Sequence, residues 1–336
     1  MKDEECSQLE IEKTPDEIMK EAIDAGLTHF YVGYSGGKDS GICLDLIAKN
    51  YPKYFKGAMY INTGIGTNAT LDFVKEWCKQ KNYPLFIVRP EDVKRVRKTI
   101  RGNPGENFSY EKLVTEHGFP HQGFHTTTMR HLKYFPMRKF VKDRIALGEK
   151  PCIVSGVRVN ESARRKIKWK KYLWQDSKMW FVSPIFFKSN DWFMKYWIEH
   201  NIKRSPVYET LHLSGDCLCG CFARENELEL LKMFHPEVYE KIKRLEKLIK
   251  EKGTNEAKEN TTWGNYKQST SNVEAQDDIE GIICTECFHD QNQDESKAKD
   301  TSYLREKITS TITDEEAEQR RTKRELINKN KKHNTT

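Results

Sequence analysis

The stretch that decides the fold is Phe30-Tyr31-Val32-Gly33-Tyr34-Ser35-Gly36-Gly37-Lys38-Asp39-Ser40-Gly41. It begins with a short apolar run, continues through two successive glycines and leads into residues 42–48, which are typical of a helix. Paired glycines let the backbone approach a ligand closely and turn its N–H groups inward. The N-terminus of the following helix favours a negative charge. The sequence therefore predicts an anion-binding loop between a strand and a helix.

The side chains of this loop suit a phosphate or a sulfate. Lys38 can neutralise one of its oxygens, and Ser40 can donate a hydrogen bond to it or cap the helix. Asp39 is suited to hold Mg²⁺ if a polyphosphate binds. The alternative is a tight glycine turn in which Ser35 or Asp39 only caps the helix. We expect the anion site, because strand, loop and helix all fall where such a site needs them.

Strands and helices alternate along the first part of the chain. Thr14 is expected to cap the first helix, and Pro15 is expected to begin it. We expect strands at residues 30–34, 58–61, 85–88 and 152–155, and helices at 16–26, 42–48, 71–78 and 134–147. This order predicts an α/β fold, a doubly wound and mostly parallel sheet with helices on both faces.

The chain changes character near residue 186. An aromatic-rich helix is expected at residues 189–201, and two more helices near 224–250. Beyond residue 252 apolar residues become rare, which predicts a disordered or loosely helical tail. The expected organisation is an N-terminal helix (1–27), a nucleotide-binding domain (28–210), a cysteine-rich, metal-binding helical region (211–290) and the tail (291–336).

Charge and hydropathy bound the class of protein. The net charge of +7 hides an asymmetry, because residues 251–336 carry a net charge of −4 and the remaining 250 residues one of +11. A basic body favours anionic ligands, from nucleotides to nucleic acid. No apolar run approaches the ~20 residues of a membrane helix, and the first residues lack a secretory signal. We expect a cytoplasmic protein that makes no membrane contact.

Nine cysteines are many for such a chain. Five of them form two close sets, Cys217, Cys219 and Cys221, and then Cys284 and Cys287. In a reducing compartment such sets indicate a metal or redox site rather than disulfides. Four thiolates drawn from the two sets could complete a tetrahedral Zn²⁺ site or a [4Fe–4S] cube.

The residues Ser35 to Ser40 resemble the signature of the adenine-nucleotide alpha hydrolase superfamily, which includes ATP pyrophosphatases and phosphoadenylyl-sulfate (PAPS) reductases. Further landmarks resemble the PAPS reductase branch and follow in its order. They are Asn62-Thr63-Gly64, Leu132-Lys133-Tyr134-Phe135-Pro136, residues 156–165, Pro184-Ile185, Asp191-Trp192 and Ser205-Pro206-Val207-Tyr208. The resemblance spans residues 30–221.

The resemblance implies a set of contacts to an adenine nucleotide. The residues that it assigns to the nucleotide and its phosphates are Ser35, Gly36, Gly37, Lys38, Asp39, Ser40, Asn62, Thr63, Gly64, Lys133, Gly156, Arg158, Glu161, Ser162 and Arg165. The chemistry of Arg158 agrees, because it leaves the end of a strand and a guanidinium matches phosphate and sulfate oxygens in pairs. Glu161 could orient one of the arginines.

Two departures from the family pattern bear on the reaction. Cluster-bearing reductases carry cysteine just before the segment that begins at Leu132, where this chain has His125 and His131 but no cysteine. Reductases also end in a mobile tail whose cysteine attacks sulfur, and Glu286-Cys287-Phe288-His289 is one residue short of that pattern. If Cys287 ligates a metal, it cannot also be a free nucleophile.

Three hypotheses follow. The first is an adenine sulfonucleotide reductase, acting on PAPS or adenylyl sulfate (APS), in which Lys38 and Asp39 serve the site, Cys287 is the nucleophile and a thioredoxin-like protein is the reductant. The second is an ATP pyrophosphatase that activates a nucleic acid for sulfur insertion, with Mg²⁺ at Asp39. The third is a nucleotide-binding regulator without chemistry, and the intact loop argues against it.

Overall fold

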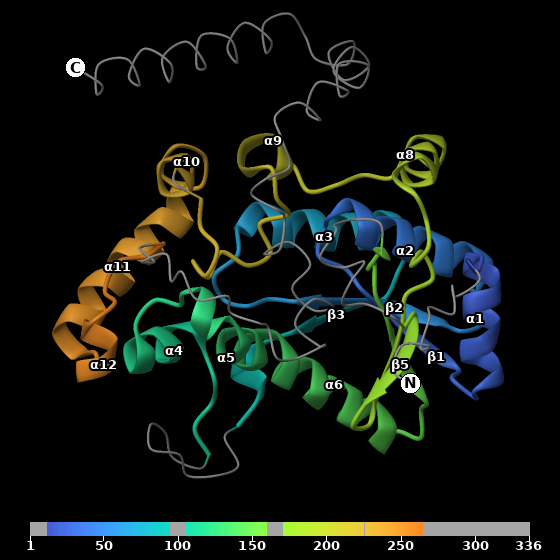
Figure 1. Ribbon diagram of the computed structural model, residues 1–336, viewed down its shortest axis with the longest axis horizontal. Coiled ribbons are helices and arrows are strands. Elements are labelled where there is room, and N and C mark those ends of the chain that lie inside the picture. The colour runs from blue at the N-terminus through green and yellow to red at the C-terminus, as the bar shows by residue number, and fades with distance from the viewer. Residues whose placement is uncertain (1–11, 95–104, 160–170, 225, 265–336) are drawn as a thin grey trace, which may run out of the picture. The chain divides into compact units, whose positions relative to one another are not determined.

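The computed structural model describes residues 12–94, 105–159, 171–224 and 226–264 (Figure 1). All of them lie in one compact unit. Within these ranges no helix has the length and apolar character that crossing a membrane requires.

A six-stranded sheet forms the centre of the fold, in the order β3-β2-β1-β4-β6-β5. Five strands run parallel, and only the edge strand β5 is antiparallel to its neighbour. Val32 of β1 lies opposite Ala58 of β2 on one side and Val154 of β4 on the other. The strands are β1 (His29–Gly33), β2 (Phe55–Ile61), β3 (Leu85–Val88), β4 (Pro151–Val154), β5 (Leu173–Asp176) and β6 (Met179–Val182).

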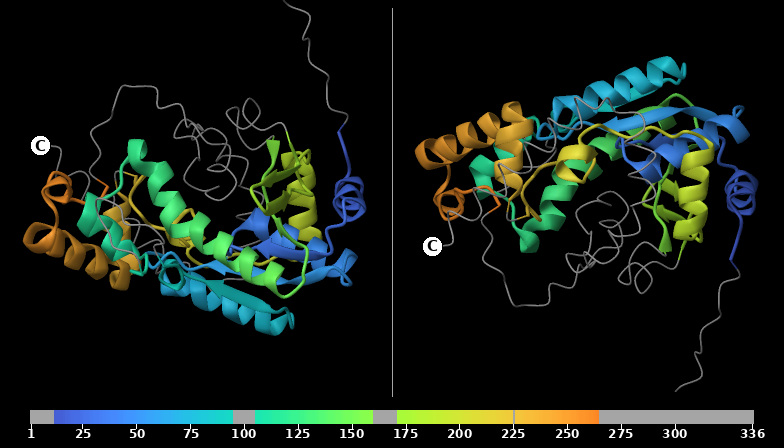
Figure 2. Two further views of the ribbon diagram at one scale, coloured as in Figure 1. Left: turned by 90° about the horizontal axis from the view of Figure 1, so that it is seen from below. Right: turned by 90° about the horizontal axis from the view of Figure 1, so that it is seen from above.

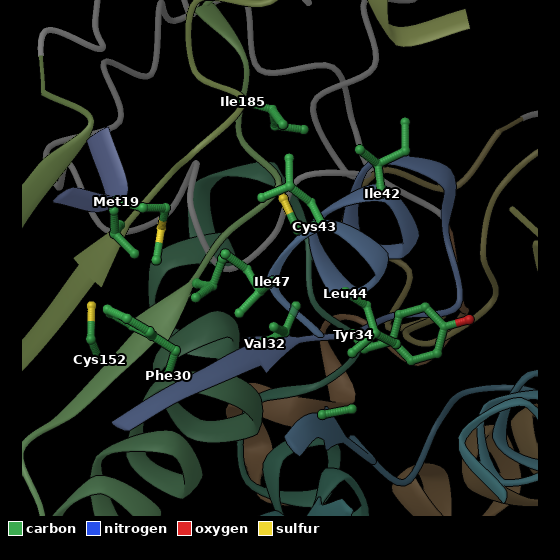
Figure 3. Packing of buried hydrophobic residues seen from close by; sticks show 14 of the residues in the cluster. Met19, Phe30, Val32, Tyr34, Ile42, Cys43, Leu44, Ile47, Cys152 and Ile185 are labelled. Atoms are coloured by element: carbon green, nitrogen blue, oxygen red, sulfur yellow. The ribbon is translucent and has the colours of Figure 1, made fainter. Parts of the chain in front are cut away.

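Helices cover both faces of the sheet (Figure 2). Successive side chains of a strand point to opposite faces, so Phe30 and Val32 of β1 pack with α1, α2, α3 and α8, while Tyr31 packs with α6. Figure 3 shows the first of these cores, with Cys43 of α2 and Cys152 of β4 among its apolar side chains. The helices are α1 (Pro15–Asp24), α2 (Lys38–Asn50), α3 (Asn68–Gln80), α6 (Phe135–Ala146) and α8 (Asn190–Glu199).

A second core lies beside the sheet and is built from helices. Val238, Ile242, Leu245 and Ile249 recur at helical spacing along α11, bury that face and pack with Leu113 of α4. The helices that build it are α4 (Tyr110–His117), α10 (Glu227–Phe234), α11 (Pro236–Lys252) and α12 (Asn255–Lys258). The described residues also form α5 (His125–Met129), α9 (Tyr208–Leu211), 3₁₀ turns at Pro90–Asp92 and Gln122–Phe124 and a π-helical turn at Arg130–Tyr134.

The fold class predicted from the sequence is confirmed: the protein is α/β, with a mostly parallel, doubly wound sheet and helices on both faces. Thr14 caps α1 through a reciprocal capping box with Glu17. The antiparallel strand β5 was not expected. Ser177 lies in the turn from β5 to β6 and has a φ of +56°. Glycine is the usual residue at such a φ, and because serine stands there, the sequence carries no signal for this turn.

Candidate functional site

The loop between β1 and α2 is a preformed cradle of main-chain N–H groups. Gly37 is the N-cap residue of α2, and among the described residues no side chain caps the helix. Neither Ser35 nor Asp39 therefore takes the capping role of the alternative interpretation. The first N–H groups of a helix have no partner within it, so those that begin α2 can bind a ligand. Gly36 has a φ of +81°, which favours glycine.

The two serines of the loop bond to each other and to the loop backbone. Their hydroxyl oxygens lie 3.1 Å apart. The Ser40 hydroxyl donates to the Gly37 carbonyl at 3.2 Å, and the Ser35 hydroxyl accepts from the Gly37 N–H at 3.3 Å. These bonds fix the conformation of the loop without a ligand, which is the preorganisation that an anion site requires.

Lys38, the first residue of α2, carries a poorly solvated ammonium group. Burial lowers its pKa, nearby Asp39 opposes this shift, and Arg204 and Arg158 add to it. Its Nζ lies 5.6 Å from the ring centroid of Phe193 and 5.7 Å from that of Trp197. Within the described part of the chain, no hydrogen bond or ion pair satisfies this ammonium, so an anionic ligand would offset its desolvation.

Arg158 follows β4 and joins the loop through Asp39. Its Nε donates to Asp39 Oδ1 at 2.7 Å, and its Nη1 donates to Asn190 Oδ1 at 2.8 Å. The guanidinium carbon lies 4.3 Å from the ring centroid of Phe193, and the whole residue is buried. The pair thus connects the first turn of α2 with the carboxyl end of β4, beside the point where the strand order reverses.

Gly156 allows this close approach. A Cβ atom at this position would stand 2.8 Å from the main-chain carbon of Asp39 and 3.0 Å from the Ser40 nitrogen. Those atoms belong to backbone, which cannot move aside cheaply. The predicted site residue Gly156 is therefore needed for packing between the chain that follows β4 and the anion loop.

A second segment lines the loop from the other side. The Ser205 N–H donates to the Gly36 carbonyl at 2.8 Å. Next to it, the Arg204 guanidinium lies on the rings of Trp197 and Tyr208 and bonds Glu209 at 2.8 Å. Among the described residues, the cations of Lys38, Arg158 and Arg204 therefore lie close together at the loop.

The predicted residues Asn62, Thr63 and Gly64 form a turn after β2. Asn62 Oδ1 accepts the Gly64 N–H at 3.0 Å, and the buried Thr63 hydroxyl donates to the Asp216 carbonyl at 3.1 Å. Lys241 of α11 donates to the Gly64 carbonyl at 2.5 Å. The turn is fixed from two sides, and its place after a parallel strand agrees with a ligand contact.

Lys133 is buried in an ion pair with Asp216. Lys133 Nζ lies 2.9 Å from Asp216 Oδ2, and the Ser214 hydroxyl donates to Oδ1 at 2.8 Å. The pair ties the π-helical turn to the segment that carries the first cysteine set. A contact between Lys133 and a nucleotide stays a prediction.

The comparison with known families identifies the family of the chain. The family model described as the phosphoadenosine phosphosulfate reductase domain matches residues 29–222, more than half of the chain. The chain belongs to this family. The matched span of the PAPS reductase family contains the anion loop, Arg158 and the first cysteine set.

Solved structures with similar folds match at low identity. A PAPS reductase from Candida auris in a phosphate complex is 18% identical, with 59% of this chain and 85% of that chain covered and a TM-score of 0.41. A U34-tRNA thiolase from Methanococcus maripaludis with its [4Fe-4S] cluster is 15% identical, with coverages of 74% and 87% and a TM-score of 0.36. An NH3-dependent NAD synthetase from Campylobacter jejuni is 13% identical, with coverages of 76% and 96% and a TM-score of 0.34. No curated protein matches the chain.

The first cysteine set of this PAPS reductase family chain lies beside Tyr110. Cys219 and Cys221 are buried and Cys217 is half-buried. Burial, followed by the fields of these three thiols, raises the pKa of Tyr110, whose hydroxyl donates to the Cys219 carbonyl at 2.8 Å. Within the described ranges, no three His, Cys, Asp or Glu side chains form a metal-binding group. The described residues alone therefore do not fit a complete metal site.

Three cysteines outside the two sets are core residues. Cys43, Cys78 and Cys152 are buried, and burial raises the pKa of Cys78 to about 12 and that of Cys43 further. Such thiols stay protonated and are poor nucleophiles.

Several predicted site residues lie outside the described residues: Glu161, Ser162, Arg165, Cys284 and Cys287. The structure adds four residues that sequence reasoning missed, Asn190, Phe193, Trp197 and Arg204. Asn190 and Phe193 flank the landmark Asp191-Trp192, and Arg204 precedes the landmark at residue 205, so adjacency to the family motifs was the available signal.

Proposed function

We propose that the protein is a sulfonucleotide reductase-like enzyme, which binds PAPS or APS with its phosphosulfate on the anion loop. The observation that carries this proposal is the buried Arg158 guanidinium, held against the first turn of α2 by Asp39 at 2.7 Å. It stands next to the desolvated ammonium of Lys38. Two cations and a row of main-chain N–H groups suit the oxygens of a phosphosulfate.

The state of Asp39 favours a metal-free substrate. A carboxylate can hold Mg²⁺ through one oxygen, and because Oδ1 of Asp39 is bonded to Arg158, only Oδ2 is left for a cation. An arginine at that distance also repels a divalent cation. A sulfonucleotide needs no Mg²⁺ for a thiol attack, while an ATP pyrophosphatase needs it for adenylyl transfer, in which pyrophosphate leaves.

The proposed chemistry is nucleophilic. A cysteine thiolate attacks the sulfur of the phosphosulfate, the bond from sulfur to the bridging oxygen breaks, and the nucleotide phosphate leaves with the electron pair. A dithiol reductant of the thioredoxin class then releases sulfite from the S-sulfocysteine and becomes a disulfide, which supplies two electrons. The cationic site lowers the pKa of a thiol that enters it. Cys287 is the proposed nucleophile.

The remaining cysteines support a proposed metal site. We propose that thiolates from Cys217, Cys219, Cys221 and Cys284 hold Zn²⁺ or a [4Fe–4S] cluster, because Cys287 as the nucleophile cannot also be a ligand. Such a metal would supply folding energy to this region when bound. No step of the proposed reaction passes through it.

The second candidate function is an ATP pyrophosphatase that activates a nucleic acid for sulfur insertion. It is favoured by the segment before Leu132, where reductases that bind a cluster carry cysteine. Here His125 packs edge-on against Phe222 at 5.0 Å, and His131 lies 4.9 Å from Phe108. The basic body would then contact the polynucleotide backbone.

One assay separates the two functions. Anaerobically purified protein is incubated with PAPS and thioredoxin, and separately with ATP and Mg²⁺, and sulfite and pyrophosphate are measured. The first function predicts sulfite, lost in Cys287→Ser and kept in Cys6→Ser, a cysteine outside both sets. Pyrophosphate without sulfite would support the second function instead. Lys38→Ala should abolish turnover in either case.

A further inference from the structure

Three residues contact the Arg158 guanidinium and fix its position. Its Nε meets Asp39 and its Nη1 meets Asn190, at 2.7 and 2.8 Å, and its planar face lies 4.3 Å from the ring centroid of Phe193. Two of these three contacts come from α8. The side chain is therefore fixed in position and in rotation about its own plane.

These contacts leave the Nη2 edge of the guanidinium without a hydrogen bond to the described residues. Arginine has five N–H donors, and the contacts within the described ranges use the one on Nε and one on Nη1. Nη2 makes no hydrogen bond to another residue within the described ranges, so this edge is available to a ligand. An oxyanion there could take two parallel hydrogen bonds from Nη1 and Nη2.

Helix α8, which carries Asn190 and Phe193, is itself bonded to α2. Ser189 caps α8 by accepting the Trp192 N–H. Tyr196 donates to Asp45 Oδ2 at 3.1 Å, and His200 lies at the same distance from that oxygen. Because Asp45 belongs to α2, these bonds fix α8, which holds Arg158, relative to α2, which follows the anion loop.

We infer that Asn190 and Phe193 are positioning residues that aim the Nη2 edge of Arg158 at the substrate oxyanion. The amide of Asn190 is suited to this task because it fixes the guanidinium without cancelling its charge. A carboxylate of the same shape would bond equally well but would add a negative charge to an anion site. Phe193 stabilises the guanidinium by a cation–π contact with its ring. This inference rests on the proposed function.

The test is the affinity for PAPS of the full-length protein and its variants, measured by calorimetric titration. Asn190→Ala should weaken binding about 10- to 100-fold, the range for a lost hydrogen bond to a charged group. Asn190→Asp should weaken it at least as much, although it keeps the shape of the side chain. Phe193→Leu should weaken it several-fold, and Phe193→Tyr should restore it. Lys195→Ala, on the exposed side of the same helix, should stay within about twofold of wild type.

The outcomes separate the inference from the proposed function. A purely structural role predicts that Asn190→Asp binds like wild type, and that result, or wild-type affinity in Asn190→Ala, overturns the inference. Thermal melting identifies a variant that fails to fold. If an Asn190 variant fails to fold, the affinities of Phe193→Leu and Phe193→Tyr decide whether the inference holds. If wild type binds ATP with Mg²⁺ but not PAPS, the proposed function fails, and the same variants titrated with ATP still decide the role of α8. If wild type binds neither nucleotide, both proposals are wrong.

Discussion

Asp39 Oδ1 accepts a hydrogen bond from Arg158 Nε at 2.7 Å, across 119 positions of sequence. The bond joins the first turn of the helix after β1 to the residue that follows β4. It places a fixed cation beside the anion loop, and it uses one of the two Asp39 oxygens that could bind a metal. Both effects lead to testable consequences.

Asp39→Asn should separate a positioning role from a metal-binding role. The amide oxygen can still accept from Arg158, so PAPS affinity should change by less than about tenfold and should not respond to Mg²⁺. Titrations with and without Mg²⁺ measure this. A loss of nucleotide binding that tracks the loss of Mg²⁺ dependence would instead assign the metal to Asp39.

Lys38→Met should weaken the binding of PAPS and stabilise the free protein. The ammonium contributes a charge-assisted contact, so affinity should fall about 10- to 100-fold. The free protein should gain about 0.5–2 kcal/mol, because a desolvated charge disappears. Chemical denaturation and calorimetric titration measure the two effects, and a variant that is less stable than wild type would contradict the desolvation argument.

Lys38 also sets a pH dependence. Because burial lowers its pKa in the folded state, the unfolded chain holds this proton more tightly. Between the lowered pKa and the ordinary value near 10.5, the unfolded state therefore binds more protons, and stability owed to this group rises with pH. Anion affinity should fall over the same window, at a pH below that of an ordinary lysine. A binding profile with no step below pH 10.5 in wild type, or an unchanged step in Lys38→Met, would contradict this assignment.

Gly156→Ala should damage the site through backbone contact. The added Cβ would press on the main chain of Asp39 at 2.8 Å, which should cost about 1–3 kcal/mol of stability and reduce nucleotide affinity. Gly33→Ala is the matched control at the end of β1, because its Cβ would meet only an ordinary contact of 3.5 Å. Equal effects of the two substitutions would contradict the proposed close approach.

The cysteine sets should give the protein a bound metal. Metal analysis and visible absorption of anaerobically purified protein should find zinc or an iron–sulfur cluster, and Cys219→Ser should lower the content while Cys6→Ser should not. Metal-free wild-type protein would remove this proposal without affecting the anion site.

The sequence predicted what local patterns encode. The apolar run of β1, the paired glycines and the helix after them required no long-range information, and the loop at Gly36 and Gly37 forms as expected. The helix at residues 189–201 was also expected. Its purpose was not, because the contact of Asn190 with Arg158 joins residues 32 positions apart.

Charge pairing was the least predictable part of the site. Asp39 has the residue type and position of a metal ligand, and only the fold shows that an arginine from a distant strand end bonds it. Likewise, the resemblance to the family motif predicts that Lys133 contacts a phosphate. In the fold, Lys133 is buried against Asp216, which lies 83 positions away in the sequence. Local sequence identifies which charges exist, and tertiary packing decides which of them meet.

The most direct test is a crystal structure of the protein with PAPS bound. We predict that the phosphosulfate lies on the N–H groups that begin α2, with oxygens within hydrogen-bond distance of Lys38 Nζ and Arg158 Nη2. An empty loop, with the nucleotide bound elsewhere on the molecule, would contradict the account.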